Sequence, residues 1–192
     1  MGLFSTIEPM EELIFKYIDV RAYVGAPTQA LSTGRDGAHV LLKDGLNRWV
    51  LSRKRHYVEG LWRMVGGGIE LGESPLDAAQ RELREELGVE IDEGKLVPLI
   101  HAEVTSEVEG KNYSFSDFVF YATVSQPLQI ADELEQLGHF SDAELNQAIG
   151  HFDRLPDLPI NNEDREGNWM DYGKVWGPIH RAAFERVKEL GL

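Results

Sequence analysis

Residues 74–88 contain a complete set of signals for the start and the end of an α-helix, and they constrain the fold more than any other segment. Ser74 can cap the helix with its hydroxyl group, Pro75 suits the first helical position, and an acid, Asp77, follows three residues after the cap. Gly88 is the residue type that most often ends a helix. Between these limits, apolar residues recur at helical spacing: Leu76, Ala79, Leu83 and Leu87. The segment predicts an amphipathic helix that packs against a sheet.

Three glutamates crowd a second arc of this helix. With about 100° per residue, Glu85 and Glu86 lie roughly 60° and 40° to either side of Glu82. Their mutual repulsion favours a positive partner, and Mg²⁺ and Mn²⁺ prefer carboxylate oxygens and bridge to substrate phosphates. Arg81, four residues before Glu85, could orient or partly neutralise the group. A solvated acidic helix face is the alternative interpretation.

The rest of the chain mixes strand and helix signals, with no internal repeat. Apolar runs on either side of Asp44-Gly45 predict a β-hairpin, and those on either side of Glu109-Gly110 predict a second pair of strands. Ser141, followed three residues later by Glu144, predicts a short helix that begins with a capping box. The apolar run at 13–24 fits a helix or a strand equally well.

The C-terminal part predicts an exposed loop and then a helix. Residues 157–169 are polar and contain proline and glycine. The helix is expected to follow, with Pro178 in its first turn and with one apolar face formed by Ile179, Ala183, Val187 and Leu190. Strands mixed with at least three helices predict an α/β or α+β sandwich.

Length and composition predict a single domain. With 192 residues, of which 42% are hydrophobic, the chain can bury one sizeable core. We expect this core at 34–150, an N-terminal extension at 1–33, and a loop with a C-terminal helix at 151–192. The net charge of −14 argues against electrostatic binding to nucleic acid or to an anionic membrane, so a phosphate-rich substrate would need a mediating cation. The chain has no cysteine and no run long enough to span a membrane, and a cytoplasmic location is expected.

The acidic helix is part of a longer motif, G-x5-E-x7-R-E-U-x-E-E-x-G-U, in which U is a bulky aliphatic residue. The matching residues are Gly67, Glu73, Arg81, Glu82, Leu83, Glu85, Glu86, Gly88 and Val89. A chance match in a chain of this length has a probability on the order of one in ten million. The segment resembles the signature box of the Nudix hydrolase family. This resemblance implies an α/β/α sandwich with a mixed sheet, a loop-helix-loop catalytic element, and hydrolysis of a nucleoside diphosphate linked to another group.

The resemblance also implies roles for individual residues. Glu82, Glu85 and Glu86 would be metal ligands, and Glu82 or a neighbouring acid would polarise the attacking water. Glu73 would join the metal network or hold the loop, and Arg81 would fix the carboxylates. Gly67 would let the backbone approach the metal and the phosphates closely.

Outside the box, the resemblance indicates further candidates. Arg53, followed by Gly60-x-Trp62 and then Gly66-Gly67, resembles the approach to the box in family members, including those that act on nucleotide sugars. Arg53, Lys54 and Trp62 are the substrate-binding candidates, and the two basic residues could meet the phosphates. Val65 stands where the family usually has proline before two glycines. Glu133 is the candidate for an extra metal-binding or basic glutamate, with Glu135 in reserve. The aromatic candidates for stacking on a base are Tyr113, Phe115, Trp169, Tyr172 and Trp176.

These observations predict an Mg²⁺- or Mn²⁺-dependent pyrophosphohydrolase that acts on a nucleoside diphosphate-linked small molecule. A nucleotide sugar is favoured, and a nucleoside triphosphate is the other substrate considered. An isomerase of isoprenoid diphosphates that shares the fold would need a catalytic cysteine, which the chain lacks. A catalytically idle nucleotide sensor is the alternative. The two extensions are expected to form a homodimer contact or a substrate lid.

Overall fold

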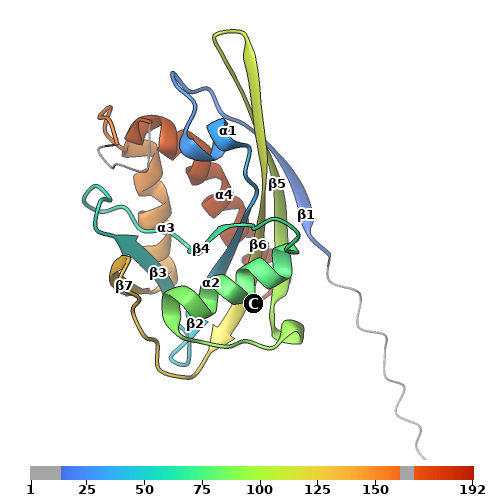
Figure 1. Cartoon of the computed structure of the whole chain (residues 1–192). Helices are drawn as coiled ribbons and strands as arrows, with labels where there is room; N and C mark the ends of the chain where they lie inside the picture. The colour runs from blue at the N-terminus through green and yellow to red at the C-terminus, as the bar shows by residue number, and fades with distance from the viewer. Residues whose placement is uncertain (1–13, 161–166) are drawn as a thin grey trace, which may run out of the picture.

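A mixed β-sheet forms the centre of the molecule (Figure 1). The computed structural model describes residues 14–160 and 167–192. In these ranges the sheet has seven strands in the order β1-β5-β6-β2-β3-β7, with β4 paired to β2 outside this path. The strands are β1 (Lys16–Arg21), β2 (Gly37–Asp44), β3 (Trp49–Lys54), β4 (Val65–Gly68), β5 (Val97–Val108), β6 (Lys111–Val124) and β7 (Leu134–Phe140). The α-helices are α1 (Gln29–Thr33), α2 (Pro75–Leu87), α3 (Asp142–His151) and α4 (Trp169–Leu190), and two short 3-10 helices span Glu93–Lys95 and Phe152–Arg154.

The sheet contains both parallel and antiparallel strand pairs. β1 runs parallel to β5 and β2 parallel to β6, whereas β5 and β6, β2 and β3, β2 and β4, and β3 and β7 pair antiparallel. The strand pairs predicted around Asp44-Gly45 and Glu109-Gly110 are both confirmed. The run at 13–24, which the sequence left open between helix and strand, contains β1.

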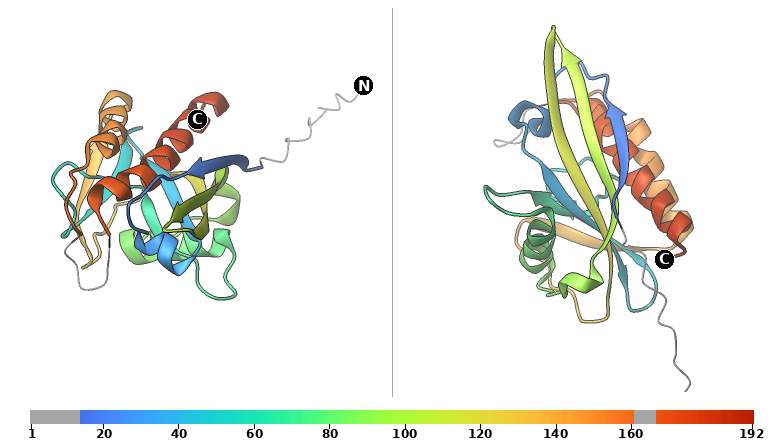
Figure 2. Two further views of the ribbon diagram at one scale, coloured as in Figure 1. Left: turned by 90° about the horizontal axis from the view of Figure 1, so that it is seen from above. Right: turned by 90° about the vertical axis from the view of Figure 1, so that its right-hand side faces the viewer.

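Helices cover both faces of the sheet (Figure 2). Alternate residues of a strand point to opposite faces, and β2 divides its apolar residues accordingly. Val40 and Leu42 pack with α2, whereas Leu41 packs with the core under α3 and α4. The result is the predicted α/β sandwich with a helix layer on each side of a mixed sheet.

The ends of two predicted helices are confirmed in detail. The Ser74 hydroxyl accepts a hydrogen bond from the Asp77 amide at 3.1 Å, and Gly88 ends α2 in a left-handed conformation, with a φ of 64°. In α3, the side chains of Ser141 and Glu144 each accept a hydrogen bond from the backbone amide of the other residue, which completes the capping box.

The predicted start of the C-terminal helix is wrong. Helix α4 begins at Trp169, where the side chain of Asn168 accepts a hydrogen bond from the Met170 amide, and Pro178 lies inside the helix. Proline removes one hydrogen bond of a helix, and its ring clashes with the preceding residue. Packing holds this turn, since Val175 and Ile179 are fully buried and a Cβ at Gly177 would lie 2.9 Å from the Cβ of Phe152. Of the loop expected at 157–169, residues 161–166 lie outside the described residues.

The described parts of both terminal extensions pack on the core of their own chain. β1 extends the sheet beside β5, and α4 lies across the face that also carries α3. A homodimer contact or a substrate lid in these segments stays a prediction. None of the helices in residues 14–160 and 167–192 has the length and apolar character needed to cross a membrane.

Candidate active site

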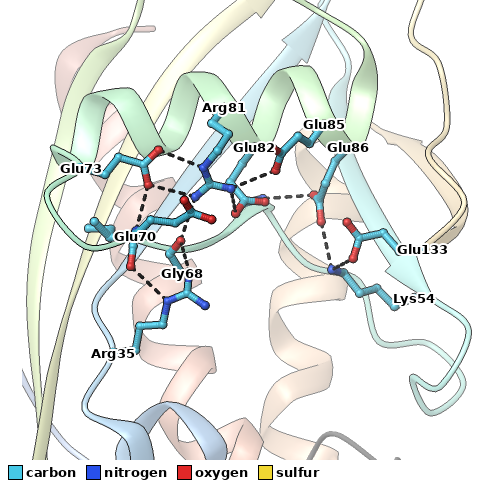
Figure 3. Close-up of polar contacts among 12 residues, drawn as sticks. Arg35, Lys54, Gly68, Glu70, Glu73, Arg81, Glu82, Glu85, Glu86 and Glu133 are labelled. Carbon is cyan, nitrogen blue, oxygen red and sulfur yellow. Dashed lines mark hydrogen bonds and ion pairs between the residues drawn. The ribbon is translucent and has the colours of Figure 1, made fainter.

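Arg81 gathers the acids at the edge of α2 (Figure 3). Its guanidinium donates hydrogen bonds to Glu73 at 2.9 Å, to Glu82 at 2.8 Å and to Glu85 at 2.9 Å. It also donates to the carbonyl oxygen of Gly68 at 2.9 Å, which joins the helix to β4. The hydrogen bonds from Arg81 lower the pKa of the Glu73 carboxyl group below its ordinary value. One arginine therefore fixes three acids and the backbone of the glycine segment.

Lys54 is the second cation of the site. Its Nζ lies 3.1 Å from Glu86 Oε1 and donates a hydrogen bond to Glu133 at 2.9 Å (Figure 3). Burial lowers the pKa of Lys54, but the negative charges of Glu86 and Glu133 outweigh this effect and raise it. Glu133, which the sequence predicts as an extra acid of the site, is thus connected to the acids of α2 through Lys54.

Two of the acids are buried beneath these cations. Glu82 is 9% exposed and Glu86 is 1% exposed, whereas the side chain of Glu85 is half exposed. Burial raises the pKa of Glu82, although Arg81 opposes the shift. Glu86 accepts a hydrogen bond from the Gly66 amide at 3.2 Å, while its other oxygen accepts none and has only the nearby Lys54 charge.

The glycine segment of β4 needs its glycines because other groups approach the backbone closely. A Cβ at Gly67 would overlap the carboxylate of Glu82. Gly66 has a φ of 140°, and a Cβ there would overlap the carbonyl oxygen of Ala38 on the neighbouring strand. Arg35 secures the end of the segment, since it donates to the carbonyl oxygens of Gly68 and Ile69, each at 3.0 Å.

A pocket of about 390 Å³ opens beside this segment. Its acidic side includes Glu82, Glu85 and Glu133, and Lys54 lies among them. The lining also includes aromatic and polar side chains from several elements: Phe115, Tyr172, Trp176, His39, Arg63 and Arg35. The pocket thus combines groups that suit a phosphate with flat apolar surfaces.

The residue types of the site fit a hard divalent cation. In residues 14–160 and 167–192, no three acidic or histidine side chains converge on one point. Arg81 and Lys54 each pair with two or more of the carboxylates. The donors are carboxylate oxygens beside a close backbone, which suits Mg²⁺ or Mn²⁺. The buried Glu86 Oε1 accepts no hydrogen bond, lies 3.1 Å from Lys54 Nζ, and is a further carboxylate oxygen that could serve as a ligand.

The predicted site residues do not all reach the pocket. Gly67, Glu82, Glu85, Lys54 and Glu133 line it, and Arg81, Glu73 and Glu86 contact this group. Two proposed substrate-binding residues lie elsewhere. Arg53 pairs with Glu135 at 3.0 Å, and Trp62 packs its ring edge to face on Phe140.

The sequence did not single out three residues that line the pocket: Arg35, His39 and Arg63. Each is an isolated polar residue in or beside a strand, where no motif marks it. Of the aromatic candidates, Phe115, Tyr172 and Trp176 line the pocket, whereas Tyr113 and Trp169 do not.

Comparison with known proteins relates this geometry to a family. The nucleoside triphosphatase NudI of Escherichia fergusonii is 37% identical over 79 residues, which cover 41% of this chain and 49% of that protein. An RNA pyrophosphohydrolase of Helicobacter pylori is 43% identical over 68 residues, which cover 34% of this chain and 44% of that protein. This chain therefore spans less than half the length of either relative.

A solved structure supports the same fold. A MutT/nudix family protein from Enterococcus faecalis superposes with a TM-score of 0.53 at 17% identity, over 81% of this chain and 62% of that one. A sequence model of the NUDIX domain matches residues 33–172, which include the acidic helix, the glycine segment and most of the pocket wall. The chain belongs to the NUDIX domain family.

Proposed function

We propose that this protein is a divalent-metal-dependent hydrolase of a diphosphate linkage in a nucleoside diphosphate derivative. The observation that carries the proposal is the row of α2 acids beside the glycine segment at the edge of the pocket. A diphosphate repels acids, so a site that combines both needs added positive charge. The family as a whole uses divalent metal ions, which agrees with this requirement.

Glu82, Glu85, Glu86 and Glu133, with the backbone of Gly67, are the groups that would hold Mg²⁺ or Mn²⁺. A bound ion of this kind supplies an activated water and neutralises charge on the phosphate oxygens. Glu82 or a neighbouring acid would accept the proton of the water that attacks phosphorus, as the bridging P–O bond breaks.

The chain's own cations have separate tasks in this proposal. Arg81 donates hydrogen bonds to Glu73, to Glu82 and Glu85 of α2 and to the Gly68 carbonyl, so it acts as a positioning residue for these acids. Lys54 lines the pocket and can bind a phosphate oxygen as a point charge. Arg35 keeps the glycine segment in place beside the substrate.

A nucleotide sugar and a nucleoside triphosphate are the two candidate substrates. The nucleotide-sugar hypothesis depends on the stretch from Arg53 to Trp62, whose two named residues lie outside the pocket. The relative named nucleoside triphosphatase supports the second class. The net charge of −14 disfavours a long nucleic acid as the substrate.

The test is release of phosphate from a panel of nucleoside triphosphates, nucleotide sugars and dinucleotides. Each compound is assayed with Mg²⁺, with Mn²⁺ and with a chelator, and with or without an added phosphatase that reveals monophosphate products. Metal-dependent release from one class supports the hydrolase and identifies the substrate class. Tight binding without turnover of any compound would instead favour the nucleotide sensor.

A further inference from the structure

Three buried polar residues form a chain that the proposed hydrolysis does not use. Asp117 on β6 is fully buried, and its Oδ1 lies 2.8 Å from His39 Nδ1 on β2. The other nitrogen of His39, Nε2, lies 3.0 Å from Arg63 Nη2. Arg63 precedes β4 and is 7% exposed. His39 and Arg63 both line the pocket, so the chain runs from the interior of the sheet to the pocket wall.

The chemistry of arginine fixes the direction of these hydrogen bonds. A guanidinium only donates, so His39 Nε2 must accept from Arg63. The ring proton then sits on Nδ1 and is donated to Asp117. The buried carboxylate balances the buried guanidinium through the imidazole ring. A buried charge is tolerated when it is paired in this way.

Aromatic rings fix the plane of the guanidinium. The central carbon of Arg63 lies 4.0 Å from the centroid of the Trp176 ring and 5.4 Å from that of Tyr172. The ring of His39 meets Trp176 edge to face at 5.2 Å. Because Trp176 covers one face of the guanidinium, the N–H groups of Arg63 project in its plane. Arg63 Nε is buried and donates no hydrogen bond in the structure, and Tyr57 is a further hydrogen-bond partner of this side chain.

We propose that Arg63 determines base specificity by donating hydrogen bonds to a nucleobase edge with two neighbouring acceptors. Guanine offers O6 and N7, and cytosine offers O2 and N3, whereas on the corresponding edges adenine and uracil place a donor beside the acceptor. The rings of Trp176, Tyr172 and Phe115 supply flat surfaces for the base in the same pocket. This inference rests on the proposed function, because it assumes that the pocket binds a nucleotide.

His39 and Asp117 act as positioning residues for Arg63. They hold one end of the guanidinium, and their place is kept by Gly37, where a Cβ would overlap Asp117 Oδ1. Planar recognition by arginine requires a fixed orientation, which lysine cannot supply at the same site. A change at His39 should therefore alter base preference only when it removes the acceptor that Arg63 needs.

The deciding experiment is calorimetric titration of the full chain with GMP, CMP, AMP and UMP. We expect GMP or CMP to bind roughly tenfold to a hundredfold more tightly than AMP and UMP, as is typical of discrimination by a paired arginine. The separate values for GMP and CMP identify the base. Equal affinities, a preference for AMP or UMP, or no binding at millimolar concentration would overturn the proposal. Monophosphates have no diphosphate linkage, so this result is independent of the hydrolysis assay.

Variants then test the assignment to Arg63. Arg63→Lys keeps the positive charge but removes the planar guanidinium group. The affinities for the four nucleotides should then agree to within about twofold. His39→Leu should have the same effect, whereas His39→Gln, which retains an acceptor, should restore the preference. Arg186→Lys, on α4 but outside the pocket, is the matched control. A folded Arg63→Lys protein with the native preference overturns the proposal. If Arg63→Lys fails to fold, the four titrations of the native protein decide it.

Discussion

Helices α2 and α4 lie on opposite faces of one sheet and bring different chemistry to one pocket (Figure 2). Helix α2 presents carboxylates, which are held by Arg81 and Lys54. Helix α4 presents aromatic rings, of which Trp176 packs on the guanidinium of Arg63. The acids are paired with positive side chains, whereas Trp176 and Tyr172 belong to the buried core.

This difference indicates a division of labour across the sheet. The α2 side would act on the diphosphate, where charge develops during hydrolysis, and the α4 side would bind the base, where no bond changes. Interactions made only in the transition state affect kcat, whereas uniform binding affects KM. Substitutions on α2 should therefore mainly lower kcat, and substitutions on α4 should mainly raise KM.

The largest effect is expected on the α2 side. Glu82→Gln keeps the size of the side chain but removes a carboxylate charge, so kcat should fall by about a hundredfold or more. KM should change little, and the protein should remain folded. Steady-state kinetics and circular dichroism measure both properties. Glu90→Gln, an exposed glutamate just beyond α2, is the control and should retain activity. Normal turnover in a folded Glu82→Gln protein would contradict the metal-ligand assignment.

A smaller effect with the opposite kinetic signature is expected on the α4 side. Trp176→Leu removes the aromatic surface of the pocket, and a stacked base contributes about 1–3 kcal/mol. KM should rise roughly tenfold to a hundredfold, with kcat within a few-fold of the native value. Trp169→Leu changes a buried tryptophan of the same helix outside the pocket and controls for general disturbance. If Trp176→Leu lowers kcat alone, the proposed division between the helices is wrong.

The sequence predicted α2 far better than α4, because the signals that define α2 are all local in the sequence. The cap at Ser74, the stop at Gly88 and the acidic arc all lie within one segment. The start of α4 was misplaced because Pro178 follows the rule for a first helical turn, while packing against the sheet overrides that rule. Local signals predict an element only where tertiary packing agrees with them.

The same limit applies to the pocket. Glu86 and Lys54 come together because β3 lies beside α2 in space, which no spacing in the sequence shows. The prediction treated Arg53 and Lys54 alike, although neighbouring residues of a strand point to opposite faces. Only Lys54 lines the pocket. Arg63 lies in a segment without periodicity, and only its contacts with His39 and Trp176 distinguish it.

His180 on the α4 side is expected to make the stability of the fold depend on pH. His180 on α4 is buried, donates to the Trp176 carbonyl at 2.9 Å and accepts from the Met64 amide at 3.1 Å. Burial, with the nearby Arg63 and His39, lowers its pKa well below 6.5. Below pH 6.5, His180 is therefore protonated in the unfolded chain but stays neutral in the folded chain. Stability from this residue is complete above pH 6.5 and decreases as the pH falls further, by up to about 1.4 kcal/mol per pH unit.

Urea unfolding at pH 7.5 and pH 5.5 measures this contribution. His180→Gln should reduce the difference in unfolding free energy between the two conditions, even if the variant is less stable at both. His151→Gln changes a histidine that is only partly buried and should leave the difference unchanged. An unchanged difference in His180→Gln would assign the pH effect to other groups.

The smallest effects are expected at the caps of the two helices. The side chain of Ser74 accepts a hydrogen bond at the start of α2, and that of Asn168 does so at the start of α4. Ser74→Ala and Asn168→Ala should each lower the free energy of unfolding by about 1 kcal/mol. Their effects on activity should differ, because Ser74 follows Glu73, which binds Arg81, whereas Asn168 lies two turns from Trp176. Fraying at the start of α2 should lower kcat a few-fold, while Asn168→Ala should retain it. A fall in kcat in Asn168→Ala alone would show that the catalytic acids depend on α4, and the two faces would then act as one unit.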